Sequence, residues 1–287
     1  MKTEGNKTID KVLSFLENNR GGFISGADMA ESIGISRNAV WKAINELRQK
    51  GYEIESVTNK GYRLTEKNDI ISAEGIRAYM DPDLISKTGE LIVFESVDST
   101  NDKAKELALK GAAHGTCVVA VRQDGGRGRK DHLFYSPEGG IYMSVILKPD
   151  RIPFIKSDII TAHIGSCVCD AIENLTGISP VIRGINDLYI KDKKICGILI
   201  EAGSEFDSGT LQWIVAGIGI NFDSDINKFP KELSKKTASL FKPSKATISK
   251  NCLIADILKR ICDTEDLSEE SVDESFRKRR NVTDQNT

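Results

Sequence analysis

The sequence lacks long apolar runs. No stretch approaches the roughly 18 consecutive apolar residues that a membrane-spanning helix needs. The first six residues, MKTEGN, hold no apolar signal region. We therefore expect a cytoplasmic protein with no membrane partner.

Metal-binding patterns are also missing. The six cysteines are spread over residues 117–262, and the nearest pair, Cys167 and Cys169, lies in an apolar segment without metal-ligand spacing. Neither a His-Glu-x-x-His sequence nor a serine or cysteine nucleophile with a paired base is recognisable. We expect reduced, buried thiols and no metal held by protein ligands, including the three histidines, which are His114, His132 and His163.

The charge is balanced, with 40 Lys and Arg against 42 Asp and Glu, a net charge of −2. Such a balance excludes a protein that coats nucleic acid through bulk charge. Residues 1–67 hold 11 basic and 9 acidic residues, and this small excess decides nothing. Any role in DNA binding has to be argued from pattern.

The first 51 residues predict three short helices. Thr8 is placed to cap the first, Ser25 precedes the second, and the turn Gly34-Ile35-Ser36 leads into the third. The third helix is predicted over Arg37–Gln49, with inward-facing apolar residues at Val40, Ala43, Ile44 and Leu47. Two short helices joined by a glycine-containing turn are typical of a helix-turn-helix.

Two short strands are predicted after the third helix. Residues 52–57 and 61–64 flank Thr58-Asn59-Lys60 as a hairpin, which is the wing of a winged helix-turn-helix. The exposed start of a recognition helix is where base edges are usually contacted. The alternative is a small helical protein-interaction module. We favour DNA binding by residues 1–67, through Ser36, Arg37, Asn38, Lys42 and Asn45.

Beyond residue 68 the pattern changes to short apolar strands with two flanking helices. The helices are predicted at about 101–110 and 159–175. Strands that follow one another like hairpins predict an α+β domain with a mixed sheet over residues 68–265, rather than a doubly wound parallel sheet. The strands are predicted at 91–94, 116–121, 141–147, 181–183, 187–190, 196–201 and 213–220.

The most informative segment is QDGGRGRK, residues 123–130. Its glycines let the backbone approach a ligand closely, and its two arginines offer forked donors for a phosphate or carboxylate. The segment is not a Walker loop, because no Gly-Lys-Ser/Thr closes it. A mobile surface loop is the alternative interpretation.

Six blocks of residues resemble the biotin–protein ligase family in order and spacing. They are Ser99-Thr100-Asn101, Gln123 with Gly126-Arg127-Gly128-Arg129, Ser136-Pro137, Asn186-Asp187-Leu188-Tyr189, residues 193–201 (KKICGILIE) and residues 217–221 (GIGIN). The segments GISR at 34–37 and GYRL at 61–64 are similar to the bifunctional branch, in which a ligase carries a helix-turn-helix and represses the biotin operon.

The resemblance implies a reaction and its site. Family enzymes make biotinyl-5′-AMP from biotin and ATP with Mg²⁺, then transfer biotin to a lysine of a carboxylase carrier domain. The implied catalytic residues are Arg127, Arg129 and Lys194. The implied biotin-binding residues are Ser99, Thr100, Asn101, Gln123, Gly126, Arg127, Gly128, Arg129, Lys194, Gly197 and Gly217, and those for ATP are Arg129, Asn186, Asp187, Gly219 and Asn221.

The sequence departs from the family at four places, one of which is a missing residue near Glu138-Gly139-Gly140. Gly184-Ile185 stands where the family has Trp-Pro, and Asp131-His132 stands where it has a further Gly-Arg. The family also continues into a small SH3-like barrel, and we expect residues 266–287 to be the truncated entry to it. These departures predict impaired adenylate synthesis and carrier transfer more than impaired biotin binding.

The family resemblance also implies partners: operator DNA, a biotin carboxyl carrier domain, and a second copy of the chain in a homodimer. Two rival hypotheses remain. One is a biotin-responsive repressor with weak or no ligase activity, and the other is a lipoate-type acyl ligase on the related fold. The Gly-Arg-Gly-Arg block and the helix-turn-helix favour biotin.

Overall fold

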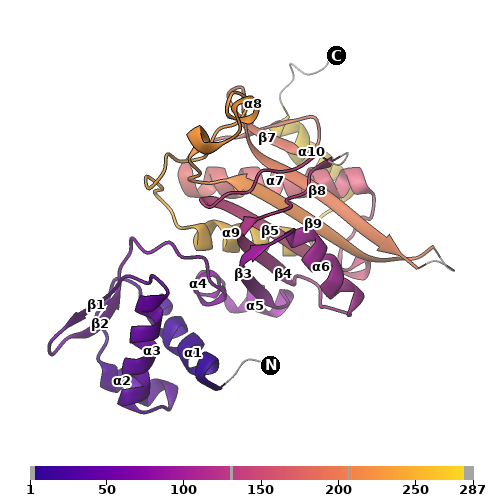
Figure 1. The fold of residues 1–287 in the computed structure, drawn as a ribbon. Helices are drawn as coiled ribbons and strands as arrows, with labels where there is room; N and C mark the ends of the chain where they lie inside the picture. The colour runs from indigo at the N-terminus through magenta and orange to yellow at the C-terminus, as the bar shows by residue number, and fades with distance from the viewer. Residues whose placement is uncertain (1–3, 130–131, 206, 208, 281–287) are drawn as a thin grey trace. The chain divides into compact units, whose positions relative to one another are not determined.

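The computed structural model describes residues 4–129, 132–205, 207 and 209–280. The chain divides into two compact units (Figure 1). The first comprises Met1–Tyr79 with Lys250–Cys252, and the second comprises Met80–Ser249 with Leu253–Thr287. The first unit therefore reaches about a dozen residues beyond the boundary predicted after residue 67.

The first unit is a three-helix bundle with a two-stranded wing. Helices α1 (Glu4–Asn18), α2 (Gly26–Ile33) and α3 (Arg37–Gln49) are followed by the antiparallel strands β1 (Ile54–Val57) and β2 (Gly61–Leu64) and by the short helix α4 (Ala73–Arg77). The predicted third helix and its apolar face are confirmed, because Val40, Ala43, Ile44 and Leu47 are buried in the core of this unit.

Two of the three predicted helix caps are confirmed. The Ser25 hydroxyl oxygen accepts from Ala27 N at 3.1 Å, and that of Ser36 accepts from Ala39 N at 3.1 Å. The prediction for Thr8 was wrong, because α1 begins at Glu4 and Thr8 lies inside it. The helix extends past the cap candidate although Gly5 and Asn6 have low helix propensity.

Glycine at position 61 is required by the wing. Its φ is +96°, and a Cβ there would lie 1.9 Å from the carbonyl oxygen of Ile24. This close approach lets Ile24 and Tyr62 exchange two backbone hydrogen bonds of 2.8 Å. The wing is thereby fastened to the segment that leads into α2.

The second unit is built on one seven-stranded sheet in the order β3-β4-β5-β9-β8-β7-β6. Only the β3–β4 pair is parallel. The predicted α+β class with a mixed sheet is therefore confirmed. The strands are β3 (Leu91–Val97), β4 (Cys117–Gln123), β5 (Gly140–Leu147), β6 (Val181–Arg183), β7 (Asp187–Ile190), β8 (Lys193–Ser204) and β9 (Leu211–Asn221).

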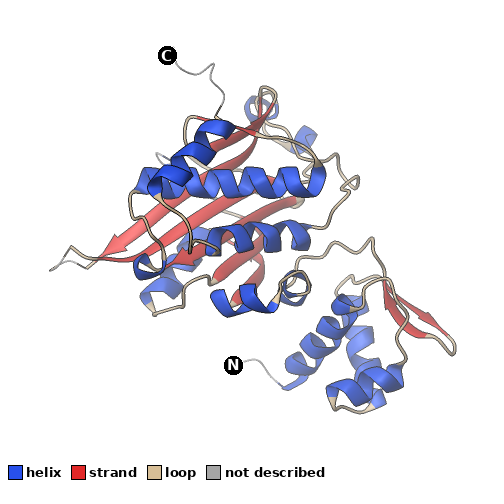
Figure 2. Cartoon of the chain, turned by 180° about the vertical axis from the view of Figure 1, so that it is seen from behind, coloured by secondary structure: helices blue, strands red, loops and turns tan. Residues whose placement is uncertain are grey.

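Helices cover both faces of this sheet. Helix α6 (Thr100–Leu109) packs on β4, β5 and β9, whereas the 20-residue α7 (Ser157–Thr176) packs on β7 and β8 from the other side (Figures 1 and 2). Successive residues of a strand face opposite sides, so Gly197 and Leu199 of β8 face a different layer from Ile198. A pocket lies on the face that α6 covers, because Leu199 and Gly217 line it together with Thr100.

The remaining helices of the second unit are short or lie late in the chain. They are α5 (Pro82–Lys87), η2 (Pro149–Arg151), η3 (Ile226–Lys228), α8 (Lys231–Ser234), most of α9 (Lys250–Cys262) and α10 (Glu269–Arg279). Helix α10 packs on α7, with Arg279 paired to Asp170 at 2.6 Å and also to Glu173. Residues predicted as an entry to another domain thus belong, up to Arg279, to this unit, while 281–287 lie outside the described residues.

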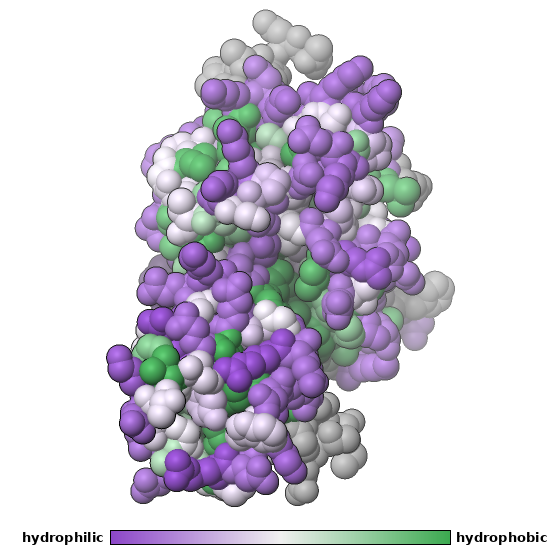
Figure 3. All heavy atoms as spheres, turned by 60° about the vertical axis from the view of Figure 1, so that its left-hand side comes forward, coloured by the Kyte–Doolittle hydropathy of each residue, from purple (hydrophilic) through white to green (hydrophobic). Residues whose placement is uncertain are grey.

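Across the described residues, no helix is both long and apolar enough to cross a membrane. The face drawn in Figure 3 is mostly hydrophilic. The core of the second unit consists of its strands and the inner faces of α7 and α9. Every residue of β5 is buried.

Candidate functional site

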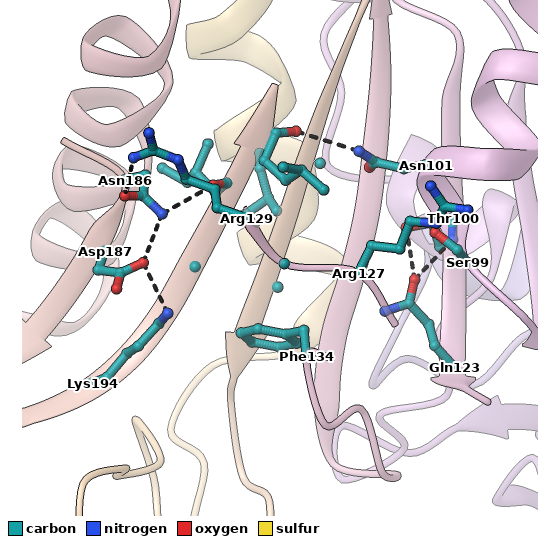
Figure 4. A pocket seen from close by; sticks show the side chains of 17 residues that line it. Ser99, Thr100, Asn101, Gln123, Arg127, Arg129, Phe134, Asn186, Asp187 and Lys194 are labelled. Atoms are coloured by element: carbon teal, nitrogen blue, oxygen red, sulfur yellow. Dashed lines mark hydrogen bonds and ion pairs between the residues drawn. The ribbon is translucent and has the colours of Figure 1, made fainter. Parts of the chain in front are cut away.

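A pocket lies where the start of α6, the end of β4, the loop after β4, and strands β8 and β9 meet (Figure 4). Thirteen of the predicted residues line it: Ser99, Thr100, Asn101, Gln123, Arg127, Gly128, Arg129, Asn186, Asp187, Lys194, Gly197, Gly217 and Gly219. Segments almost 120 residues apart in sequence therefore build one site.

The pocket has two sides separated by Phe134 (Figure 4). We call the first the amide side, formed by Ser99, Thr100, Asn101 and Gln123, with Arg127 at its rim. We call the second the lysine side, formed by Arg129, Asn186, Asp187 and Lys194.

On the amide side, the carboxamide of Gln123 is held in one orientation. Its Oε1 accepts from the backbone N–H of Thr100 at 2.8 Å and from the Thr100 hydroxyl at 3.0 Å. Its Nε2 donates to Ser136 Oγ at 2.9 Å, and the Ser136 hydroxyl donates to the carbonyl of Phe134 at 2.8 Å. A backbone N–H can only donate, so it fixes the direction of every bond in this chain.

The carboxamide of Asn101 is equally constrained. Its Nδ2 donates to a carboxylate oxygen of Glu201 at 2.8 Å, and its Oδ1 accepts from the Ser144 hydroxyl at 2.7 Å. Asn101 is only 4% exposed and Ser144 is fully buried. Both the nitrogen and the oxygen of the Asn101 amide are therefore hydrogen-bonded within the protein, and the side chain forms part of the pocket wall.

Ser99 remains the better direct donor to a ligand. It caps α6, with its hydroxyl oxygen accepting from Asp102 N at 3.4 Å. An acceptor role leaves the hydroxyl hydrogen to be donated elsewhere. Gln123 likewise has a second N–H besides the one given to Ser136. Together these groups can pair with a small polar ring that presents both a carbonyl and N–H groups.

On the lysine side, charged and polar groups form a short row. Lys194 Nζ lies 2.8 Å from Asp187, Asn186 Nδ2 donates to the same Asp187 oxygen at 2.9 Å, and Arg129 donates to Asn186 Oδ1 at 3.0 Å. The side chains of Lys194 and Asp187 are 30% and 27% exposed. Pairs this exposed contribute at most ~1 kcal/mol, so an anionic ligand can replace them.

Phe134 explains two of the glycines. A Cβ on Gly219 would lie 2.5 Å from the Phe134 ring, and one on Gly197 would lie 3.1 Å from it. A Cβ on Gly217 would lie 2.0 Å from Asn101 Oδ1. The family resemblance implied biotin binding at Gly197 and Gly217 and ATP binding at Gly219; in this structure all three make room for the side chains that form the pocket walls.

Two predicted residues do not line the pocket. Gly126 is buried beneath the loop, where a Cβ would lie 2.3 Å from the Phe134 carbonyl oxygen and 2.5 Å from Ser136 Oγ. Asn221 is 3% exposed at the end of β9, and its Nδ2 donates to the Ala238 carbonyl at 3.2 Å. Gly126 therefore leaves room for the Phe134 carbonyl and for Ser136, and Asn221 holds the chain at Ala238 beside the end of β9.

The sequence-based reasoning missed several residues of the site. Phe134, Ile198, Leu199 and Ile218 line the pocket. Ser144, Asp102 and Glu201 stand behind it and bind its side chains, and Lys105 in turn pairs with Asp102 and Glu201. The residues of β8 and β9 lie inside blocks quoted for the family resemblance, whereas Ser144 and Lys105 lie outside every block, and the sequence singled out none of them.

Five of the six thiols are unsuited to nucleophilic catalysis. Burial raises the pKa of Cys169 and Cys262 to about 12, and it also raises the pKa of Cys117, Cys167 and Cys196. A thiol with so high a pKa holds almost no thiolate at neutral pH. Within the described ranges, no group of three or more His, Cys, Asp or Glu side chains is arranged to hold a metal ion.

A second candidate site lies on α3 of the first unit. Ser36 caps this helix, Arg37, Asn38 and Lys42 are exposed, and Asn45 is half-buried. Arg48, on the same helix, instead donates to the Ile54 carbonyl at 2.8 Å and so ties α3 to the wing. Trp41, which the sequence-based reasoning passed over, is 55% exposed on this helix.

Comparison with known proteins gives matches for both units. Residues 93–221 match the model of the biotin/lipoate A/B protein ligase family, and residues 8–63 match that of an HTH domain. The bifunctional ligase/repressor BirA of Bacillus subtilis is 40% identical over 237 residues, which cover 82% of this chain and 71% of that protein. The protein of that name from Escherichia coli is 32% identical over 216 residues, 74% of this chain and 62% of that protein.

The fold comparison agrees. The biotin protein ligase of Aquifex aeolicus, solved in complex with biotin and ATP, is similar with a TM-score of 0.51 at 28% identity; the match covers 66% of this chain and 71% of that one. The biotin protein ligase of Leishmania major, at 22% identity and a TM-score of 0.55, shares the fold.

Proposed function

Because this chain belongs to the biotin/lipoate A/B protein ligase family and is related to its bifunctional ligase/repressors, we propose that it is a biotin–protein ligase that also represses transcription. In the proposed reaction, biotin and ATP give biotinyl-5′-AMP and pyrophosphate. The carrier's lysine amine then attacks the acyl carbon, and AMP leaves. A carboxylate is a poor acyl donor, so the mixed anhydride supplies the leaving group.

The observation that carries this proposal is the pairing of two unlike sides in one pocket. The amide side suits the ureido ring of biotin, which presents a carbonyl and two N–H groups to Ser99, Thr100 and Gln123. The lysine side suits the other end of the molecule, where the biotin carboxylate meets the α-phosphate of ATP. A rigid polar wall at one end and exchangeable cations at the other orient biotin for attack.

The residues of the lysine side would then act on developing charge. Lys194 bridges the attacking carboxylate and the α-phosphate, and Arg127 and Arg129 bind the phosphate from the loop. Asn186 and Asp187 hold the nucleotide. Mg²⁺ would be carried mainly by the ATP phosphates, because Asp187 alone offers one carboxylate at this end, and it would neutralise phosphate charge. Closure of the loop would keep water from the adenylate.

A biotinylation assay tests the ligase. The purified chain, biotin, ATP, Mg²⁺ and a biotin carboxyl carrier domain are mixed, and the carrier's mass is followed. We expect the mass increase of one biotinyl group, and none when ATP is omitted.

An adenylate that forms without any transfer would favour the second candidate, a biotin-responsive repressor with little ligase activity. The Gly184-Ile185 turn, where φ of Gly184 is +63°, supports that candidate because it supplies no aromatic wall.

For the repressor role, we propose a homodimer that places two α3 helices on two operator half-sites in the cytoplasm, where ATP and DNA are available. One helix-turn-helix with a nearly balanced charge makes few phosphate contacts, so two half-sites are needed for useful affinity. The test is a gel shift on a duplex selected by the chain from a random library. Scrambling one half-site should weaken binding by at least ~100-fold. Equal binding would rule out the paired mode.

A further inference from the structure

Lys105 of α6 lies between two carboxylates from different elements. Its Nζ is 2.7 Å from Asp102 of the same helix and 2.9 Å from Glu201 of β8. The Lys105 side chain is 22% exposed. Burial lowers the pKa of Lys105, but the hydrogen bonds with Asp102 and Glu201 outweigh it, so the pKa stands above its ordinary value and the charge is secure.

Each of these carboxylates also holds a residue of the pocket. The second oxygen of Asp102 lies 3.0 Å from Nε of Arg127, and the second oxygen of Glu201 accepts from Asn101 Nδ2 at 2.8 Å. Charges thus alternate along a row from Arg127 through Asp102 and Lys105 to Glu201, and the row ends on the Asn101 amide. The row joins the loop after β4, helix α6 and strand β8.

We propose that Lys105 is a positioning residue for ligand binding, although it does not line the pocket. Lys105 keeps Asp102 and Glu201 in place. Asp102 then orients the Arg127 guanidinium toward the pocket, and Glu201 fixes which end of the Asn101 amide is the nitrogen. The inference rests on the proposed function, since an anionic ligand gives the row its second role. Without Lys105, Glu201 would lose its counter-charge while Asp102 would keep Arg127, and the Asn101 amide that Glu201 holds would lose its fixed position.

A matched control lies on the same helix. Lys103 lies two residues before Lys105. Both Lys103 and Lys110 pair with Glu106, each at 2.6 Å. This second cluster is of the same chemical kind, but Glu106 contacts no pocket residue among the bonds of the described chain. Lys103→Met therefore removes an equivalent exposed charge from α6 without touching the row.

The test measures biotin-dependent pyrophosphate release and calorimetric biotin binding in the full chain. We expect Lys105→Met to raise the KM for biotin and the Kd roughly tenfold or more, with a smaller change in kcat. Lys103→Met should stay within about twofold on both. A structural role alone would lower the Tm of Lys105→Met and leave its KM for biotin unchanged.

A second variant separates charge from packing. In the double variant Lys105→Met with Glu201→Gln, the uncompensated carboxylate is gone, while the glutamine oxygen can still accept from Asn101. We expect it to recover biotin affinity to within about threefold of wild type. Wild-type KM in Lys105→Met, or no recovery in the double variant, would overturn the proposal. A wild-type chain that neither binds biotin nor releases pyrophosphate would overturn the proposed function and this inference with it.

Discussion

The two sides of the pocket are built on opposite physical principles. On the amide side, Ser99, Thr100 and Asn101 are below 5% exposed and Gln123 is half-buried. The buried Ser136 and Ser144 behind them fix the directions of their hydrogen bonds. On the lysine side, the Lys194–Asp187 pair is about 30% exposed and shares Asp187 with Asn186. One side is complete before any ligand arrives, and the other exchanges its partners.

This difference assigns two tasks. A buried donor or acceptor without its partner costs ~1–3 kcal/mol, so the amide side has one stable arrangement and suits recognition of a neutral ring. Exposed ion pairs contribute ~0–1 kcal/mol, so the lysine side gives up its internal contacts cheaply and suits charge that changes during a reaction. Damage to the amide side should therefore affect biotin affinity most.

The largest effect is expected from Gly126→Ala. The new Cβ would press on the Phe134 carbonyl, on Ser136 Oγ and on Gln123 Nε2, and would dismantle the hydrogen-bonded chain. We expect biotin affinity to fall by at least ~100-fold, the loss of two such bonds. The neighbouring Gly125→Ala is the control, because its Cβ would meet only ordinary contacts at 3.4 Å or beyond. Similar Kd values for the two variants by calorimetry would remove this support of the pocket.

A smaller effect is expected from Gln123→Leu, which keeps the volume of the side chain and deletes its amide. The Thr100 N–H loses its acceptor at a buried position. The expected loss of biotin affinity is about 5- to 150-fold, from ~1–3 kcal/mol. Unchanged calorimetric affinity would show that the rigid amide is dispensable.

On the other side, Lys194→Ala should lower biotin affinity only about tenfold, the value of one charge-assisted contact. Adenylate formation should fall further, because the lysine acts on charge that develops in the transition state. Stopped-flow measurement of pyrophosphate release, compared with the Kd for biotin, separates the two. An equal fall in both quantities would contradict the division of tasks.

The smallest effect is expected from Asp187→Asn on stability. The free energy of unfolding should change by less than ~1 kcal/mol, since the pair it breaks is exposed. Asn101→Ala, which breaks buried hydrogen bonds on the amide side, is the comparison and should cost ~1–3 kcal/mol. Urea unfolding followed by circular dichroism measures both. A larger loss of unfolding free energy for Asp187→Asn than for Asn101→Ala would contradict the assignment of a rigid amide side and an exchangeable lysine side.

Local rules predicted much of the fold. The α3 bounds, the Ser25 and Ser36 caps and the β1–β2 hairpin depend on neighbours within a few residues, and they were predicted correctly. Helix α9 was overlooked although Leu253, Ile257, Leu258 and Ile261 recur at helical spacing and are fully buried. The spacing of these four apolar residues is sufficient to predict a helix.

The supports of the site are different in kind. Glu201 is 96 residues from Lys105, and Ser144 is 43 residues from Asn101. Their meeting depends on the order of strands in the sheet, which no local spacing encodes. The family resemblance indicated the residues that line the pocket and included Glu201 in one of its blocks. It gave no role to Asp102, Lys105 or Glu201, because their importance arises from contacts with one another in three dimensions.

The most direct test of the central claim is a calorimetric titration of biotin into the wild-type chain, first without nucleotide and then with ATP and Mg²⁺. A preformed amide side predicts one biotin bound per chain without ATP, with affinity that is lost in Gly126→Ala and kept in Gly125→Ala. ATP and Mg²⁺ should then convert the bound biotin to biotinyl-5′-AMP, detected by mass. Biotin that binds only when nucleotide is present, or equally well to both glycine variants, would contradict the account.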